Sequence, residues 1–267
     1  MSHPEESKIL VRLEQREVGI RVGYITINNA HKLNTLNSGL MTDFIAVCED
    51  LARDEDLRAA VVTGAGDKAF VGGADIDEMA ELNPGSARTF ITLLHRCCDA
   101  LRGLPVPVIG RIQGYALGGG LELSAACDLR VAAETAIFGM PEVRLGIPSA
   151  IEAALLPSLV GWGRTREMLF LGESFTAAQA AAWDLVERVV PPGQLDEAVE
   201  SCVQSILRAD ARAIRMQKKL IRLWEDLPLR AAVLAGIDAF VTAWESDEPR
   251  RAMRGFQAAQ LKKSSGV

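Results

Sequence analysis

The chain of 267 residues has no excess of positive charge and no long uninterrupted run of apolar residues. Its formal net charge is −6, which argues against a nucleic-acid-binding protein because neutralising phosphates requires clustered lysine and arginine. No stretch of about 18 apolar residues occurs, so we expect no membrane span. The first fifteen residues are polar and lack the apolar core of a signal peptide. We therefore expect a soluble, cytoplasmic protein.

Cysteine and histidine are also sparse. None of the five cysteines lies in a CxxC pair, and adjacent residues such as Cys97 and Cys98 rarely meet the geometry of a disulfide. A nucleophilic cysteine would find a partner base only in His3, His31 or His95, and His3 lies in the expected N-terminal tail. We predict buried free thiols in a reducing compartment.

Strand-like and helix-like runs alternate through the first half of the chain. The hydrophobic fraction of 49% and the length permit one large core with an appendage. A strand followed by a glycine-rich turn, a helix and another strand indicates an α/β fold with partly parallel pairing. The expected strands are 9–13, 18–27, 59–63, 106–111 and 129–133, and the expected helices are 38–53, 86–102 and 121–128.

After about Pro148 the sequence becomes helical in period, and only residues 186–190 read as a strand. The C-terminal part therefore resembles an all-helical appendage. Residues 229–244 are apolar over much of the helix circumference, which is typical of a buried helix. Packing on another subunit and packing on the same chain both remain open.

The segment Gly114–Leu123 joins an apolar strand to a helix and contains three consecutive glycines, 118–120. The first N–H groups of a helix lack internal partners, and the helix dipole adds positive charge there. Such a terminus binds an anion, or an oxygen that becomes one. Glu122, in the first turn, either complements the dipole or acts chemically. Neither GxGxxG nor a P-loop pattern occurs, so no dinucleotide or P-loop site is predicted.

A second glycine-rich turn, Ala69–Ile76, also follows an apolar strand. Strand ends in an α/β sheet lie on a common side, so N–H groups from the two turns can aim at one oxygen. That arrangement would form an oxyanion hole. The alternative is an ordinary tight connection in which Asp75 caps a helix.

Glu142 lies in a loop punctuated by proline and glycine, 137–148, one helix and one strand beyond Glu122. That path is long enough to return to the same edge. Two carboxylates that face one cavity allow one to be protonated and the other charged. From composition alone, a solvent-exposed Glu142 is the simpler interpretation.

Together these segments resemble the crotonase superfamily, the enoyl-CoA hydratase/isomerase family. The matching stretches are KAFVGGADIDEM, IGRIQGYALGGGLELSAACDLRVAAE and FGMPEVRLGI, with weaker matches in NNAHKLNTLN and FTAAQAAAWDLVERVVP. The resemblance implies an α/β fold, a crotonase-like spiral of repeated ββα units with a C-terminal helical trimerisation region. Residues 1–192 would form the core with the acyl-CoA site, and residues 193–267 the oligomerisation region.

The resemblance also implies an enzyme, an enoyl-CoA hydratase, with Glu122 and Glu142 as its catalytic residues. Glu122 would activate the water that attacks Cβ, and Glu142 would deliver the proton to Cα. Coenzyme A is part of the acyl-CoA substrate, and the resemblance implies no metal, no redox cofactor, and a homotrimer or a dimer of trimers. The backbone N–H groups of Ala74 and Gly119 would form the oxyanion hole. The substrate would be bound by Ala74, Asp75, Ile76, Asp77, Gly119 and Lys32, with Lys68, Lys262 and Lys263 as further cations for the coenzyme A end.

The chain departs from the family just after Glu142. Where hydratases usually carry a stretch resembling GxxPGxGGTQRL, residues 145–157 read LGIPSAIEAALLP. Side chains at 149–152 fill space that glycines leave open, and Glu152 is either a third carboxylate near the pocket or a helix-start residue. The same superfamily therefore offers alternatives: an enoyl-CoA isomerase, an acyl-CoA thioester hydrolase, or a non-catalytic CoA-binding protein.

Overall fold

The computed structural model describes residues 8–264, and side chains for residues 8–258. Contacts divide the chain into two compact units, Met1–Ile206 and Leu207–Val267. This boundary falls later than the expected one at 192/193, because helix α7 (Leu195–Leu207) belongs to the first unit. Arg16 on β1 fixes it there through a two-pronged ion pair with Glu200, at 2.9 and 2.8 Å.

Within the described residues, a large sheet of six strands runs in the order β1-β2-β3-β5-β7-β10. The pair β1–β2 is antiparallel and the other neighbours are parallel. Each strand lies where the sequence predicted one. They are β1 (Ile9–Glu17), β2 (Ile20–Ile27), β3 (Leu57–Gly64), β5 (Val108–Ile112), β7 (Leu129–Ala133) and β10 (Arg188–Val190).

A second sheet, in the order β4-β6-β8-β9, was not predicted. Its strands have three residues each, and β4, β6 and β8 are parallel while β9 is antiparallel to β8. The pairs β3–β4, β5–β6 and β7–β8 each place one strand in each sheet before the chain turns helical, which gives the repeated ββα units. The strands are β4 (Ala69–Val71), β6 (Tyr115–Leu117), β8 (Ile137–Gly139) and β9 (Ser174–Thr176).

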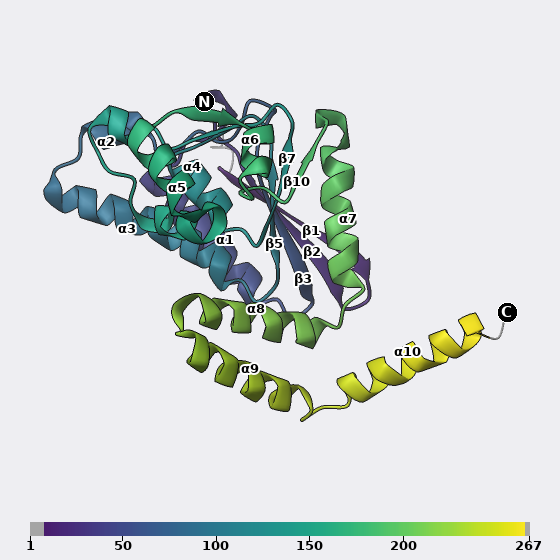
Figure 1. The fold of residues 1–267 in the computed structure, drawn as a ribbon. Helices are drawn as coiled ribbons and strands as arrows, with labels where there is room; N and C mark the ends of the chain where they lie inside the picture. The colour runs from purple at the N-terminus through teal and green to yellow at the C-terminus, as the bar shows by residue number, and fades with distance from the viewer. Residues whose placement is uncertain (1–7, 265–267) are drawn as a thin grey trace. The chain divides into compact units, whose positions relative to one another are not determined.

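Helices α1 (Ser38–Ala52) and α3 (Pro84–Gly103) pack together on one face of the large sheet, and α7 lies on the other face (Figure 1). Asn37 caps α1 by accepting the Leu40 N–H at 2.8 Å. The short helix α4 (Gly119–Ala125) is buried along its whole length, so it lies at the centre of the core. The remaining elements of this unit are α2 (Ile76–Ala80), α5 (Leu156–Leu171), α6 (Ala177–Ala182), η1 (Ala30–Lys32), η2 (Glu142–Leu145), η3 (Ile151–Leu155) and η4 (Pro192–Gln194).

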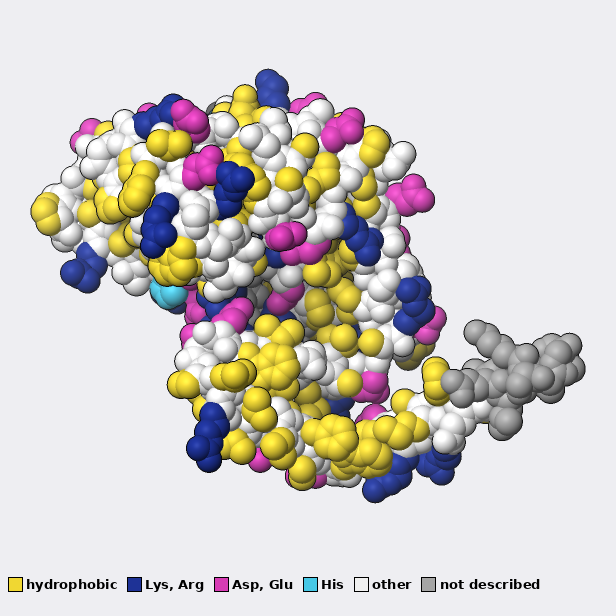
Figure 2. Space-filling view, in the orientation of Figure 1, with side chains coloured by type: hydrophobic (Ala, Val, Ile, Leu, Met, Phe, Trp, Pro, Cys, Tyr) yellow, Lys and Arg dark blue, Asp and Glu magenta, His cyan; other side chains and the backbone are white. Residues whose placement is uncertain are grey.

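The second unit consists of α8 (Ala211–Asp226), α9 (Leu229–Ala243) and α10 (Glu248–Ser264). The indole N–H of Trp224 on α8 donates to the Ala232 carbonyl of α9 at 2.9 Å, which fastens the two helices. Ala232 is the one buried residue of α9 among the described side chains. Apolar side chains gather over these helices in Figure 2. The exposed apolar residues of α9 are Leu229, Val233, Leu234, Ile237, Phe240 and Val241.

The cysteines are buried free thiols, as predicted from their spacing. Burial raises the pKa of the Cys97 thiol to about 12, so this sulfur stays protonated and unreactive at neutral pH. No helix in the described part of the chain is long and apolar enough to cross a membrane.

Candidate active site

The two glycine-rich turns meet at one edge of the small sheet. Strands β4 and β6 are parallel neighbours, so the turns that follow them leave the sheet on the same side. A β-carbon placed on Gly73 would lie 3.1 Å from the Leu117 carbonyl oxygen. The predicted convergence of the two turns is therefore present.

Each turn presents an unpaired backbone N–H group. Leu36 bonds to Gly73 and Asp75 on either side of Ala74, at 2.9 Å in both cases, so the N–H of Ala74 itself faces away from Leu36. Gly119 is the first residue of α4, and its N–H has no partner within the helix. Neither N–H forms a hydrogen bond within residues 8–264. Both are thus available to an oxygen outside the protein, which an oxyanion hole requires.

Glu142 reaches the second turn from η2. A β-carbon on Gly118 would lie 2.4 Å from Glu142 Oε1, so the carboxylate sits directly against the Gly118–Gly119 turn. Ser149 Oγ donates to the other oxygen, Oε2, at 2.8 Å. Glu142 is half-buried, and the interpretation as a solvent-exposed loop residue is wrong. One of the replacements in the altered loop, Ser149, therefore holds the Glu142 carboxylate.

Glu122 is buried on α4, and its Oε1 accepts the Ala153 N–H at 2.9 Å. Burial raises the pKa of Glu122 to about 8; the negative charges of Glu142 and Glu152 act in the same direction, while the Ala153 hydrogen bond opposes them. Glu142 therefore lies near enough to Glu122 for its charge to disfavour the ionisation of Glu122. Such a pair can hold a proton on one member and a charge on the other at neutral pH.

A third carboxylate, Glu152, lies beside this pair and is 4% exposed. His95 Nδ1 lies 2.8 Å from Glu152 Oε1, whereas Oε2 is buried without a hydrogen-bond partner among the described residues. Glu152 lies in the first turn of η3, as the helix-start interpretation has it, and it is also a third carboxylate whose charge acts on Glu122. Sequence reasoning considered His95 only as a partner for cysteine and missed this contact, which joins residues far apart in the chain.

Comparison with known proteins places these features in a family. The sequence model described as enoyl-CoA hydratase/isomerase matches residues 17–262, which is most of the chain. The chain belongs to this family.

Individual relatives agree with the family match. A short-chain-enoyl-CoA hydratase of Clostridium acetobutylicum is 34% identical over 237 residues, which cover 88% of this chain and 91% of that protein. A crotonyl-CoA hydratase of Syntrophomonas wolfei is 32% identical over 245 residues, covering 91% and 93%. The crystal structure of an enoyl-CoA hydratase from Bacillus anthracis superimposes with a TM-score of 0.88 at 30% identity, over 93% of this chain and 96% of that one. The predicted crotonase superfamily and α/β fold are confirmed.

Asp75 was expected to bind the substrate. In the structure its carboxylate forms hydrogen bonds within the protein. Its Oδ1 accepts the N–H groups of Asp77 and Glu78, at 3.0 and 3.3 Å, which caps α2 as the alternative interpretation predicted. Burial acts to raise the pKa of Asp75, but the hydrogen bonds from Lys32, Glu78 and Asp77 hold it below its ordinary value. The Asp75 carboxylate therefore remains charged and fixes the first turn.

The charge of Lys32 is paired with two carboxylates in the structure. Its Nζ lies 3.1 Å from Asp75 and 2.8 Å from Asp77, and these contacts raise the pKa of Lys32. Binding a phosphate of coenzyme A would require Lys32 to share or leave these carboxylates, so its role there stays a prediction. Lys68 is exposed beside the first turn, and Ile76 is exposed at its end. The side chains of Lys262 and Lys263 lie outside the described residues.

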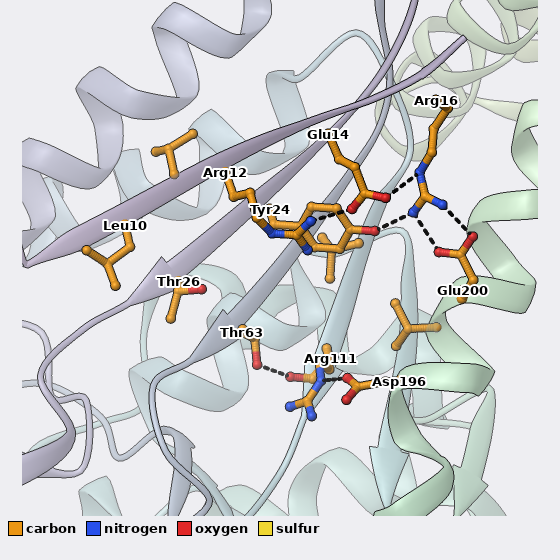
Figure 3. Close-up of a pocket in the computed structure, with 13 residues that line it drawn as sticks. Leu10, Arg12, Glu14, Arg16, Tyr24, Thr26, Thr63, Arg111, Asp196 and Glu200 are labelled. Carbon is orange, nitrogen blue, oxygen red and sulfur yellow. Dashed lines mark hydrogen bonds and ion pairs between the residues drawn. The ribbon is translucent and has the colours of Figure 1, made fainter.

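A cavity of about 620 Å³ lies elsewhere in this unit, between the large sheet and α7 (Figure 3). Its charged lining is paired internally: Arg16 contacts Glu14 and Glu200, and Arg111 contacts Asp196 at 2.6 Å. Glu122 and Glu142 do not line this cavity. The candidate active site is therefore the region around the two glycine-rich turns.

The raised pKa of Glu122 predicts a pH-dependent stability. In the folded protein the group binds a proton up to about pH 8, whereas the unfolded chain releases it near pH 4.5. Wild-type stability should therefore fall as pH rises between these values, by an amount on the order of a few kcal/mol. Glu122→Gln, which cannot ionise, should gain stability relative to wild type as pH rises from 5 to about 9. Urea unfolding at fixed protein concentration measures this difference; a constant difference across the range would contradict it.

Proposed function

We propose that the protein is an enoyl-CoA hydratase that adds water across the 2,3 double bond of an enoyl-CoA thioester. The observation that carries this proposal is the placement of both Glu122 and Glu142 at the turns that present the free N–H groups of Ala74 and Gly119. Isomerisation and binding do not require two carboxylates at one site, whereas adding a hydroxyl and a proton gives each of the two a role, one as a base and one as an acid.

The mechanism follows from these positions. The thioester oxygen accepts the N–H groups of Ala74 and Gly119, and each donor is worth about 3 kcal/mol when negative charge develops on that oxygen. Glu122, ionised, takes a proton from the water whose oxygen bonds to Cβ. The π electrons of the double bond move toward the thioester and form an enolate. Glu142, protonated, then donates its proton to Cα as the carbonyl reforms.

The position of the proton within the carboxylate pair determines which half of the reversible reaction, hydration or dehydration, the free enzyme can begin. Hydration begins with one proton, on Glu142, and ends with one proton, on Glu122. Dehydration begins from the second state. Because burial favours the neutral form of Glu122, the free enzyme rests with the pair ready for dehydration. The proton must return to Glu142 before another hydration cycle begins.

The altered loop after Glu142 supports the second candidate functions, isomerisation through the same enolate, or thioester hydrolysis through a tetrahedral oxyanion held by the same N–H groups. Residues 149–152 carry side chains where the family leaves glycines, which changes the space around the acyl group. The reactions differ in their products. Hydration adds the mass of one water, isomerisation changes no mass, and hydrolysis releases a free thiol.

The test is turnover of enoyl-CoA thioesters of several chain lengths, followed by the loss of the conjugated chromophore and by product mass. We expect hydration that is abolished or strongly reduced in Glu122→Gln and Glu142→Gln. Turnover to another product would replace the proposal with the corresponding alternative. Tight coenzyme A binding with no turnover of any thioester would favour a non-catalytic CoA-binding protein.

We also propose that the protein acts in the cytoplasm as a homotrimer or a dimer of trimers. The exposed apolar face of α9 supports assembly through the helical unit, because a contiguous exposed apolar surface typically marks an interface. The buried free thiols support a reducing compartment. Light scattering on the purified protein measures the assembly directly, and a monomeric mass would contradict the proposal.

A further inference from the structure

The loop that departs from the family places a strained backbone directly before Glu152. Ile151 has a φ of 32°, a left-handed conformation that a β-branched side chain rarely adopts. Conformations of this kind cost about 1–3 kcal/mol and persist only where the surroundings impose them. Here the turn sends Glu152 into the interior, where it is almost fully buried.

The same turn contacts Glu122 in two ways. The N–H of Ala153 donates to Glu122 Oε1 at 2.9 Å, which fixes one oxygen of the catalytic carboxylate. The neighbouring Glu152 adds a negative charge that acts on the ionisation of Glu122. The segment 151–153 therefore acts on Glu122 in two ways. The Ala153 backbone holds the Glu122 carboxylate, and the Glu152 side chain disfavours the negative charge on Glu122.

Few groups are available to balance these charges. Around Glu122 lie Glu142 from η2 and Glu152 from η3, and α3 contributes His95, Cys97 and Cys98. Burial, and then the charges of Glu152 and Glu122, raise the pKa of Cys98 well above its ordinary value, so this group stays a neutral thiol. Arg96, also on α3, acts on Cys97 but is exposed and lies 4.0 Å from Glu49.

His95 is thus the basic side chain in direct contact with the carboxylates. Its side chain is 50% exposed, whereas that of Glu152 is 4% exposed, so the imidazole links a buried carboxylate to solvent. The Cys98 thiol on α3 also lies beside Glu152. A buried carboxylate exerts a strong field on its neighbours, because little solvent screens it.

We propose that Glu152, held by His95, is a positioning residue: its buried charge keeps the proton of the catalytic pair on Glu122, while the adjoining Ala153 N–H fixes the Glu122 carboxylate in place. This inference rests on the proposed hydratase function, and it adds a residue that acts through Glu122 and does not touch the substrate. The side chains at 149–152, where the chain departs from the family, then help to set the protonation of Glu122.

Glu152→Gln tests this role because it removes the charge and preserves the shape. Without the neighbouring negative charge, Glu122 ionises more readily, so the catalytic pair loses its last proton at a lower pH. The basic limb of the kcat/KM profile should move to lower pH by about one unit. Glu152→Asp, which keeps a charge, should move the limb less. Glu134→Gln removes an exposed carboxylate of β7–β8 and should leave the profile unchanged.

A second measurement does not depend on turnover. The carbonyl stretch of protonated Glu122, assigned by its loss in Glu122→Gln, is followed by infrared difference spectroscopy as a function of pH. We expect it to disappear at lower pH in Glu152→Gln than in wild type. An inactive wild-type protein that still shows this shift would overturn the hydratase proposal alone. An active wild type whose limb and carbonyl band do not move in Glu152→Gln would overturn the role of Glu152.

His95→Leu provides a second route if Glu152→Gln does not fold. It replaces a half-exposed side chain and leaves the Glu152 charge without its hydrogen-bond partner. Because His95 holds the Glu152 carboxylate in place, its loss releases that carboxylate, and the titration of Glu122 should change by less than in Glu152→Gln. An unchanged titration in a folded His95→Leu protein would count against the proposal.

Discussion

Glu122→Gln and Glu142→Gln are each expected to lower kcat for hydration by about 10²–10⁴-fold, the usual contribution of a general acid or base. Glutamine keeps the size of the side chain and can still accept the Ala153 N–H or the Ser149 hydroxyl, but it cannot exchange a proton at the reacting carbons. KM should change much less than kcat, because the N–H groups of Ala74 and Gly119 and the coenzyme A contacts remain.

The double variant separates a working pair from two independent groups. Residues that act as a unit have non-additive effects, so Glu122→Gln/Glu142→Gln should be little slower than the worse single variant. Ser149→Ala removes only the hydroxyl that holds Glu142 and should cost much less than Glu142→Gln. Full activity in either single variant would exclude that carboxylate from the chemistry. Effects that multiply would show that the two do not share one proton.

The elements that could be predicted from sequence are those with a local signal. The strands of the large sheet are apolar runs bounded by turns, and α1 and α3 have helical spacing and asparagine caps. The site was predicted by combining such local signals: two glycine-rich turns after strands, Glu122 in the helix after the second turn, and Glu142 in a later loop punctuated by proline and glycine. The structure brings Glu122 and Glu142 to the turns, as expected.

Contacts between distant segments could not be predicted in this way. The strands of the small sheet, such as β4 and β6, have three residues and lie inside turns, too short for an alternating pattern. The pairs Arg16–Glu200 and His95–Glu152 join residues far apart in the chain, and no local sequence pattern predicts such pairs. The first pair attaches α7, which the sequence had assigned to the C-terminal region, to the first unit. The second pair holds a third carboxylate, Glu152.

The run of three glycines shows how the structure changes the meaning of a motif. From sequence, these glycines let a ligand approach the backbone. In the structure each has an internal neighbour: Glu142 faces Gly118, Leu94 faces Gly119 and Val71 faces Gly120. The motif therefore lets α4 pack closely against β4 and α3 while its first N–H group stays free.

Gly120→Ala is accordingly expected to be among the most destabilising single substitutions in the chain. A β-carbon on Gly120 would lie 2.1 Å from the Val71 carbonyl oxygen and 2.9 Å from the Val71 side chain. Both contacts involve β4 in the buried core, so the backbone itself must move. Overpacking of this kind costs about 3 kcal/mol or more. Chemical denaturation at fixed protein concentration should show this loss in the free energy of unfolding, or the variant should fail to fold.

Gly103→Ala is the matched control at the C-terminal end of α3. No atom lies within 4 Å of its would-be β-carbon, and its φ is not in the left-handed region. Alanine there should be neutral or stabilise by up to about 1 kcal/mol, because it reduces the freedom of the unfolded chain. If Gly120→Ala folds with wild-type stability, α4 and β4 do not approach as closely as the structure places them.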